Sequence, residues 1–223
     1  MCGRYVSPDT AAIEREWHIG RSSGALFARC YNVAPTTMVP IIRSAGAAEL
    51  ELIDARWGFI PAWWKQPKPP ARCYNAISEQ AATKTMWRDP YRNARCLIPA
   101  LGWYEWRAQQ KRKQPYYLFL DAERPIAFAG LMSLWTAQGK APLLTCAIMT
   151  RPASPAIEAV HDRMPVVLHA SAHAAWLDPK LGEAAEIGKL LKTAAVEQVR
   201  CYPVRLLVNS SKLDGPELIE PSS

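Results

Sequence analysis

The second residue of the chain is a cysteine that could become a reactive N-terminal group. Methionine is normally removed when a small residue follows it, and the chain begins with Met1, Cys2 and Gly3. The product would carry an α-amine and a thiol on adjacent carbon atoms. Such a 1,2-aminothiol can condense with an aldehyde to an imine and then close to a thiazolidine ring. The unperturbed pKa values are about 8 for the amine and about 8.5 for the thiol, so both are usable nucleophiles near neutral pH. Position 2 alone does not distinguish this role from an unreactive cysteine.

Two further titratable residues have neighbours that could adapt them to proton transfer. Glu105 lies among three aromatic residues in G-W-Y-E-W, where burial would raise the pKa of its carboxyl group toward a general acid or base role. A glutamate of an edge strand that points at solvent is the alternative. His161 precedes Asp162 and offers an imidazole beside a carboxylate. A single histidine is more often structural than catalytic, so the pattern leaves both roles open.

No metal or cofactor is expected. His169 and His173 have i, i+4 spacing, but no third ligand is evident nearby. The cysteines form no C-x-x-C pair, which argues against a zinc ribbon, and the chain does not read as a small disulfide-stapled secreted protein. The cysteines are Cys2, Cys30, Cys73, Cys96, Cys146 and Cys201.

Charge and aromatic patterning favour a nucleic-acid partner. The net charge is +7, which suits a polyanion but equally suits a basic enzyme with no such partner. In W-G-F-I-P-A-W-W we expect Trp57 and Phe59 to be core residues, whereas Trp63 and Trp64 either stack on bases or pack under a loop. Cations that could meet phosphates follow at once: Lys65, Lys68 and Arg72.

The chain predicts one α+β domain with a mostly antiparallel, barrel-like β core flanked by short helices. Its 19 prolines favour many short elements, and strand and helix patterns do not alternate as in a doubly wound sheet. We expect a domain over residues 1–223 with a short surface tail from about residue 214. Predicted strands are 51–57, 116–120, 126–131, 143–149 and 199–203, and predicted helices are 10–17, 172–177 and 183–196. With no apolar run of membrane length and no signal-peptide pattern, a cytoplasmic location is expected.

Six motifs in order resemble the SRAP family, the SOS-response-associated peptidases or abasic-site processing proteins. They run from Cys2 to about Lys212, which is nearly the whole chain. No single motif is decisive, but their order and spacing make the resemblance specific. The motifs are M-C-G-R-Y, Y-N-V-A-P-T, W-G-F-I-P-A-W-W, Y-N-A-x-S-E, L-I-P-A-x-G-W-Y-E-W and H-D-R-M-P.

The resemblance implies covalent capture of abasic sites in single-stranded DNA. Members of this family bind single-stranded DNA, and their N-terminal cysteine traps the ring-opened sugar aldehyde as a thiazolidine cross-link that shields the lesion. Cys2 matches that cysteine, and Asn75, Glu105 and His161 match the asparagine, glutamate and histidine of the family's active site. Asn75 would hold the amine or a sugar hydroxyl, Glu105 would relay protons, and His161 would protonate the ring oxygen as the sugar opens.

The resemblance also implies DNA-binding residues, though here the chain departs from the family pattern. Ile77 replaces an arginine of N-A-R-x-E, and Thr85 stands where relatives often carry a basic residue. Arg72 and Lys84 are nearby cations that could compensate. With these two cations added to the residues that match family positions, the predicted DNA-binding set is Arg4, Asn32, Pro35, Trp63, Trp64, Arg72, Lys84 and Thr150.

Two other functions remain open at this stage. One is a thiol peptidase or autopeptidase, as the family name records, with Cys2 as nucleophile and His161 and Glu105 assisting. The other is a module that binds damaged DNA without a covalent bond. The expected protein is a nucleoid-associated or cytoplasmic monomer of the DNA damage response, with single-stranded DNA as partner, contact with replication machinery an open possibility, and no membrane partner.

Overall fold

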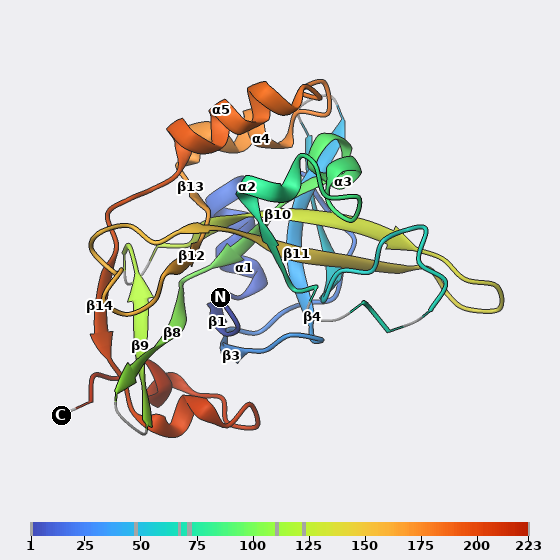
Figure 1. Cartoon of the computed structure of the whole chain (residues 1–223). Coiled ribbons are helices and arrows are strands. Elements are labelled where there is room, and N and C mark those ends of the chain that lie inside the picture. The colour runs from blue at the N-terminus through green and yellow to red at the C-terminus, as the bar shows by residue number, and fades with distance from the viewer. Residues whose placement is uncertain are drawn as a thin grey trace.

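Two β-sheets face each other across the centre of the protein (Figure 1). The computed structural model describes residues 2–46, 49–66, 68–70, 73–109, 112–121 and 124–222. The predicted α+β class with a mostly antiparallel, barrel-like core is confirmed. Helices cover one face of the larger sheet, and the smaller sheet packs against the other face.

The larger sheet nearly closes on itself. Strand β5 pairs antiparallel with β4 and also pairs in parallel with β11. The path of paired strands therefore runs from β11 through β10, β7, β4 and β5 and back to β11. This closure is the barrel-like feature of the core. Its strands, in path order, are β12 (Arg163–Pro165), β11 (Leu143–Pro152), β10 (Ile126–Trp135), β7 (Arg95–Ala100), β4 (Met38–Gly46), β5 (Glu49–Trp57) and β2 (Arg21–Ser22), while β6 (Asn75–Ile77) adds to β11 and β13 (Val167–Leu168) adds to β10.

The smaller sheet contains the first strand of the chain, β1. Tyr5 of β1 meets Trp57 of the larger sheet edge to face, with ring centroids 5.3 Å apart, and Trp103 of β8 meets Phe128 in the same way. These large buried rings fix the spacing between the two sheets. The strands in order are β14 (Arg200–Pro203), β9 (Arg112–Phe119), β8 (Gly102–Gln109), β1 (Tyr5–Ser7) and β3 (Cys30–Val33).

Strand alternation divides the apolar residues between two layers. On β11, Ala147 and Met149 face the helices, whereas Cys146 and Ile148 face the smaller sheet.

The helices are α1 (Thr10–Trp17), α2 (Ser78–Ala81), α3 (Arg88–Asn93), α4 (His173–Leu177) and α5 (Ala184–Ala194), with 3₁₀ turns at Ala170–Ala172, Leu206–Asn209 and Pro216–Ile219. The three predicted helices and five predicted strands overlap α1, α4, α5, β5, β9, β10, β11 and β14.

The C-terminal segment packs on the smaller sheet. The side chain of Asp214 accepts a hydrogen bond from Tyr31 N at 2.6 Å, and Tyr202 donates its hydroxyl proton to Ile219 O at 2.7 Å. Leu218 is fully buried. These contacts hold the last residues beside β3 and β14. Among the described residues, no helix is both long and apolar enough to cross a membrane.

Candidate active site

Cys2 and Asn75 meet in the layer between the two sheets. Cys2 lies just before β1, and it is fully buried in the cluster that both sheets line. Asn75 begins β6, whose parallel register with β11 places it beside Ile148 of the same cluster. Its Nδ2 donates a hydrogen bond to Cys2 O at 2.8 Å. Its buried Oδ1 accepts no hydrogen bond from any described residue, so one acceptor is available to a ligand.

Glu105 points into the same layer from β8. It lies two residues after Trp103, so strand alternation puts both side chains on the face toward Cys2. The residue is 1% exposed, so the predicted alternative of a solvent-facing glutamate is wrong. Burial raises the pKa of the Glu105 carboxyl to about 7. A group with that pKa can both give and accept a proton at neutral pH.

His161 approaches Glu105 from the loop before β12. Its Nε2 lies 3.7 Å from Oε2 of Glu105. Its Nδ1 accepts a hydrogen bond from Arg163 N at 2.9 Å, which leaves the proton of the neutral ring on Nε2, facing Glu105. The Asp162 carboxylate also lies 2.9 Å from Nδ1, but its side chain is 87% exposed to solvent, so we assign the tautomer from the backbone donor. Burial lowers the pKa of His161, which keeps the ring neutral.

The thiol of Cys2 is held in its protonated form. Burial raises its pKa well above the ordinary value, and the negative charge of Glu105 adds to that rise. The sulfur lies 3.8 Å from Arg4 O, to which it can donate. A stable thiolate–imidazolium pair therefore does not form between Cys2 and His161, because the thiol resists ionisation and the imidazole resists protonation.

Arg4 is clamped by Asn32 and the C-terminal segment. Its Nη1 donates to Asn32 Oδ1 at 3.1 Å and to Val208 O at 3.0 Å. Both amide hydrogens of Asn32 are used in turn, on Ser210 O at 2.9 Å and Leu213 O at 2.8 Å. Asn32 thus orients Arg4 and ties it to a segment far away in the chain.

Arg163 is a site residue that the sequence motifs did not predict, although H-D-R-M-P contains it. Its Nη2 donates to Thr150 O at 2.8 Å and to Glu79 Oε2 at 2.9 Å, and its Nη1 also donates to Glu79. These bonds lower the pKa of Glu79 to about 2. They join the end of β11 to the start of α2 beside His161. The fully buried Thr150 is held here through its backbone oxygen.

The sequence matches the SOS response associated peptidase (SRAP) family model over residues 1–211. The chain belongs to the SRAP family. The chain is 38% identical over 191 residues to the abasic site processing protein YoqW of Bacillus subtilis, covering 85% of each chain. It is 34% identical over 237 residues to the abasic site processing protein YedK of Escherichia coli, covering 99% of this chain and all of that one. A solved structure from Bacteroides thetaiotaomicron has a TM-score of 0.84 at 25% identity and full coverage of both chains.

The predicted DNA-binding residues are more scattered than Cys2, Asn75, Glu105 and the half-buried His161. Trp63 is 54% exposed and meets Trp64 edge to face, at 5.8 Å between centroids. Trp64 is fixed by two bonds, since its Nε1 donates to Lys68 O at 2.9 Å and its carbonyl accepts from Trp135 Nε1 at 2.7 Å. Pro35 is half-buried beside β3, and Lys84 is exposed between α2 and α3. Arg72 lies outside the described residues.

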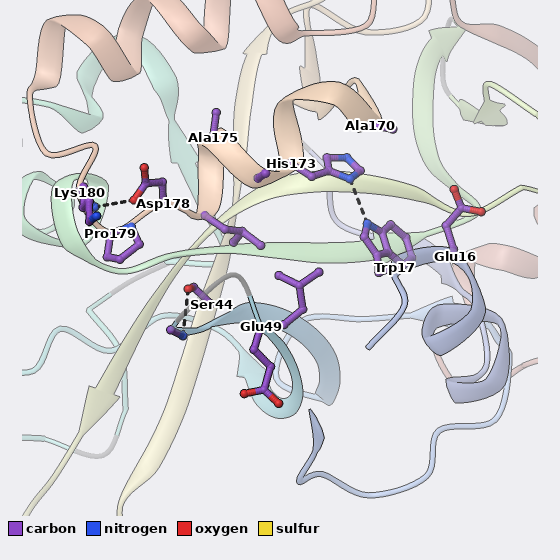
Figure 2. Close-up of a pocket in the computed structure, with 14 residues that line it drawn as sticks. Glu16, Trp17, Ser44, Glu49, Ala170, His173, Ala175, Asp178, Pro179 and Lys180 are labelled. Atoms are coloured by element: carbon purple, nitrogen blue, oxygen red, sulfur yellow. Dashed lines mark hydrogen bonds between the residues drawn. The ribbon is translucent and has the colours of Figure 1, made fainter. Parts of the chain in front are cut away.

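A cavity of about 700 Å³ lies away from these residues, between α1, α4 and the β4–β5 hairpin (Figure 2). His173, which lines it, accepts from Trp17 Nε1 at 3.0 Å through Nδ1, and its Nε2 lies 3.3 Å from Leu168 O. Both ring nitrogens therefore have protein partners, and this histidine is structural. In the described part of the chain, no cluster of three or more His, Cys, Asp or Glu residues could hold a metal ion.

Proposed function

We propose that this SRAP protein captures ring-opened abasic sites in single-stranded DNA through Cys2, once Met1 has been removed. The product would be a thiazolidine cross-link that shields the lesion. The observation that carries the proposal is the buried Glu105 carboxyl, with a pKa of about 7, facing both Cys2 and His161. The names of the relatives YoqW and YedK, both abasic site processing proteins, agree with it. An abasic sugar also needs no base to be extracted before it reacts.

The first step of the proposed reaction forms an imine. The Cys2 amine attacks C1′ of the aldehyde, and one amine proton passes to the former carbonyl oxygen to give a carbinolamine. Protonated Glu105 then gives its proton to that hydroxyl group, which leaves as water, and a protonated imine remains. The free Oδ1 of Asn75 can accept a hydrogen bond from the amine or from a sugar hydroxyl. When the sugar opens, the C1′ hydroxyl group gives up one proton and the ring oxygen takes up one, and His161, 3.7 Å from Glu105, would relay the proton between them.

The second step closes the ring. The Cys2 sulfur bonds to C1′, the electrons of the C=N bond return to nitrogen, and the thiol proton goes to ionised Glu105. Glu105 ends in the protonated state in which it began, so one carboxyl group serves both steps. Because the thiol is protonated at rest, the amine is the first nucleophile and the sulfur reacts only after the imine has formed.

The electrostatics of the site do not favour a thiol peptidase. A nucleophilic cysteine of that class needs a lowered pKa and a neighbouring imidazolium. Here burial raises the pKa of Cys2 and lowers that of His161. The site therefore suits a reaction that begins with an amine.

Cross-linking to an oligonucleotide with one abasic site tests the proposal. Wild-type protein, freed of Met1, should give an adduct that survives heating and migrates slowly in a denaturing gel. Cys2→Ser keeps the amine, so it should give only an imine, which is lost on heating unless it is first reduced with borohydride. A heat-stable, unreduced adduct of Cys2→Ser would contradict the proposed linkage.

A further inference from the structure

A second pocket lies directly behind the candidate active site. It has a volume of about 530 Å³ and lies between α2, α3, α5 and the end of β11. Figure 1 shows α5 running above α2 on the helix-covered side of the larger sheet. We call it the α5 pocket and define it by Ser78, Tyr91, Arg151, Gly188 and Lys192, which line it together with several apolar residues. Its volume falls within the range of about 300–1,000 Å³ that is usual for small-ligand sites.

The α5 pocket begins one residue beyond the active-site strands. Thr150 pairs with Ile77 in the parallel β6–β11 register, and the next residues on the two strands, Arg151 and Ser78, line the pocket. The wall shared by the two sites is the ion pair between Arg163 and Glu79, in which Glu79 also lines the pocket. A DNA strand held at Cys2 would reach the pocket past Arg163 and Glu79, around the ends of β6 and β11.

The pocket carries a positive charge that the protein only partly neutralises. Arg151 is paired with Glu197 at 2.7 Å; the Arg151 side chain is 23% exposed and that of Glu197 is 57% exposed. Lys192 is exposed at the rim and has no ion-pair partner among the described residues. Among the described residues that line the pocket, the one acid is Glu79, which is paired with Arg163. An incoming phosphate can replace the exposed Glu197 carboxylate at Arg151, since exposed pairs are weak.

Gly188 is a second observation at the α5 pocket, because a residue with no side chain lines it. It lies in the interior of α5, where glycine costs about 1 kcal/mol relative to alanine. Its backbone is not in a left-handed conformation, and a Cβ added there would meet only the Tyr91 hydroxyl at 3.7 Å, an ordinary contact. Neither backbone geometry nor close packing thus requires this glycine. What a larger side chain would change is the volume of the pocket.

We propose that the α5 pocket is a nucleotide subsite that receives a nucleotide neighbouring the abasic site on the same DNA strand. Arg151 and Lys192 bind its phosphate, and the hydroxyl groups of Ser78 and Tyr91 line the polar side. The base or sugar lies on the apolar side of the pocket, which Pro152, Ala184 and Leu191 line. This inference rests on the proposed function, because it assumes that a DNA strand bound at Cys2 continues into the α5 pocket.

Binding of a single-stranded oligonucleotide with a tetrahydrofuran abasic analogue, which has no aldehyde, tests the subsite without the covalent step. Arg151→Ala and Lys192→Ala should each weaken affinity by about 3- to 30-fold and reduce the slope of log K against log salt by about 0.7. Lys189→Ala, three residues from Lys192 on the same helix but not lining the pocket, is the matched control and should stay within about twofold. Gly188→Leu should weaken binding while the melting temperature stays equal or rises, which a structural role of Gly188 would not produce.

Shortening the strand locates the contact. Nucleotides removed one at a time from either side of the analogue should at some length abolish the difference between wild type and Arg151→Ala. Equal affinities of wild type, Arg151→Ala, Lys192→Ala and Gly188→Leu would overturn the subsite. Wild-type protein that binds the analogue but forms no cross-link with a true abasic site would overturn the proposed function, while the comparison of variants would still decide the subsite.

Discussion

Oε2 of Glu105 lies 3.7 Å from Nε2 of His161, and both groups face the buried start of the chain. The separation is too long for a strong hydrogen bond between the two groups. Burial raises the pKa of the carboxyl and lowers that of the imidazole. Near neutral pH the carboxyl group is therefore about half protonated and the imidazole is mostly neutral, which suits proton relay in a dry site.

Glu105→Gln should stabilise the protein at high pH. The folded pKa of about 7 exceeds the unfolded value of about 4.3, so the native state binds more protons between these values and wild-type stability falls as pH rises through that window. At pH 8 the variant should be more stable by roughly 1–3 kcal/mol, and the difference should vanish near pH 4. Urea unfolding at several pH values measures it.

Glu79→Gln is the control of opposite sign for that experiment. Arg163 lowers the pKa of the Glu79 carboxyl to about 2. Ionised Glu79 therefore stabilises the fold above about pH 4.3, and this stabilisation is lost as the pH falls toward 2. This variant should be less stable than wild type at neutral pH. Parallel stability curves for wild type and Glu105→Gln across pH 4–8 would contradict the raised pKa.

Asn75→Ala should slow cross-linking by roughly 10- to 100-fold, the range typical of a lost polar group that positions a reactant. The variant removes the donor to Cys2 O and the acceptor that faces the site. Single-turnover rates with an abasic oligonucleotide measure the loss. An unchanged rate in a folded variant would exclude Asn75 from the reaction.

Asn32→Leu should weaken DNA binding through Arg4. The variant leaves Ser210 O and Leu213 O without their donor and frees the Arg4 side chain from one of its two anchors. We expect a loss of roughly 1–3 kcal/mol of stability together with weaker binding of single-stranded DNA. Arg4→Ala in the Asn32→Leu background should add little further loss of affinity. Full additivity of the two changes would show that Asn32 acts independently of Arg4.

Trp63→Ala and Trp57→Ala should separate binding from folding. Trp63 is mostly exposed, so its loss should change stability by no more than about 0.5 kcal/mol but weaken single-stranded DNA binding by about 1–3 kcal/mol if it stacks on a base. Trp57 is fully buried, so its loss should cost about 3–5 kcal/mol of stability. Trp63→Ala with unaltered affinity would remove the stacking role.

The elements that the sequence predicts are those with strong local signals. The helix at Thr10–Trp17 has Asp9 as its N-cap, which accepts from Ala12 N at 2.8 Å, and its apolar residues recur on one face. Strand β4 escaped prediction because Pro40 interrupts its pattern. The structure tolerates this proline because β4 pairs with β7 only at Ile42, so no ladder bond to β7 is lost at Pro40.

The candidate site likewise contains residues with a local sequence signal and contacts without one. Cys2, Glu105 and His161 stand out in the sequence because their residue types and neighbours suggest chemistry, and a family resemblance adds Asn75. The clamp on Arg4 could not be predicted, because its carbonyl acceptor at Val208 belongs to a segment that no local pattern connects with the N-terminus. The α5 pocket likewise depends on β6–β11 register, which sequence periodicity does not specify.

The central claim is that Cys2 carries the DNA, and intact-mass analysis with peptide mapping tests it most directly. Purified wild-type protein would be incubated with a single-stranded oligonucleotide containing one abasic site and then heated. The account predicts an adduct whose mass equals protein without Met1 plus DNA less one water, with the linkage on the peptide that begins at Cys2. A heat-stable adduct on any other residue, or no adduct from protein that lacks Met1, would contradict it.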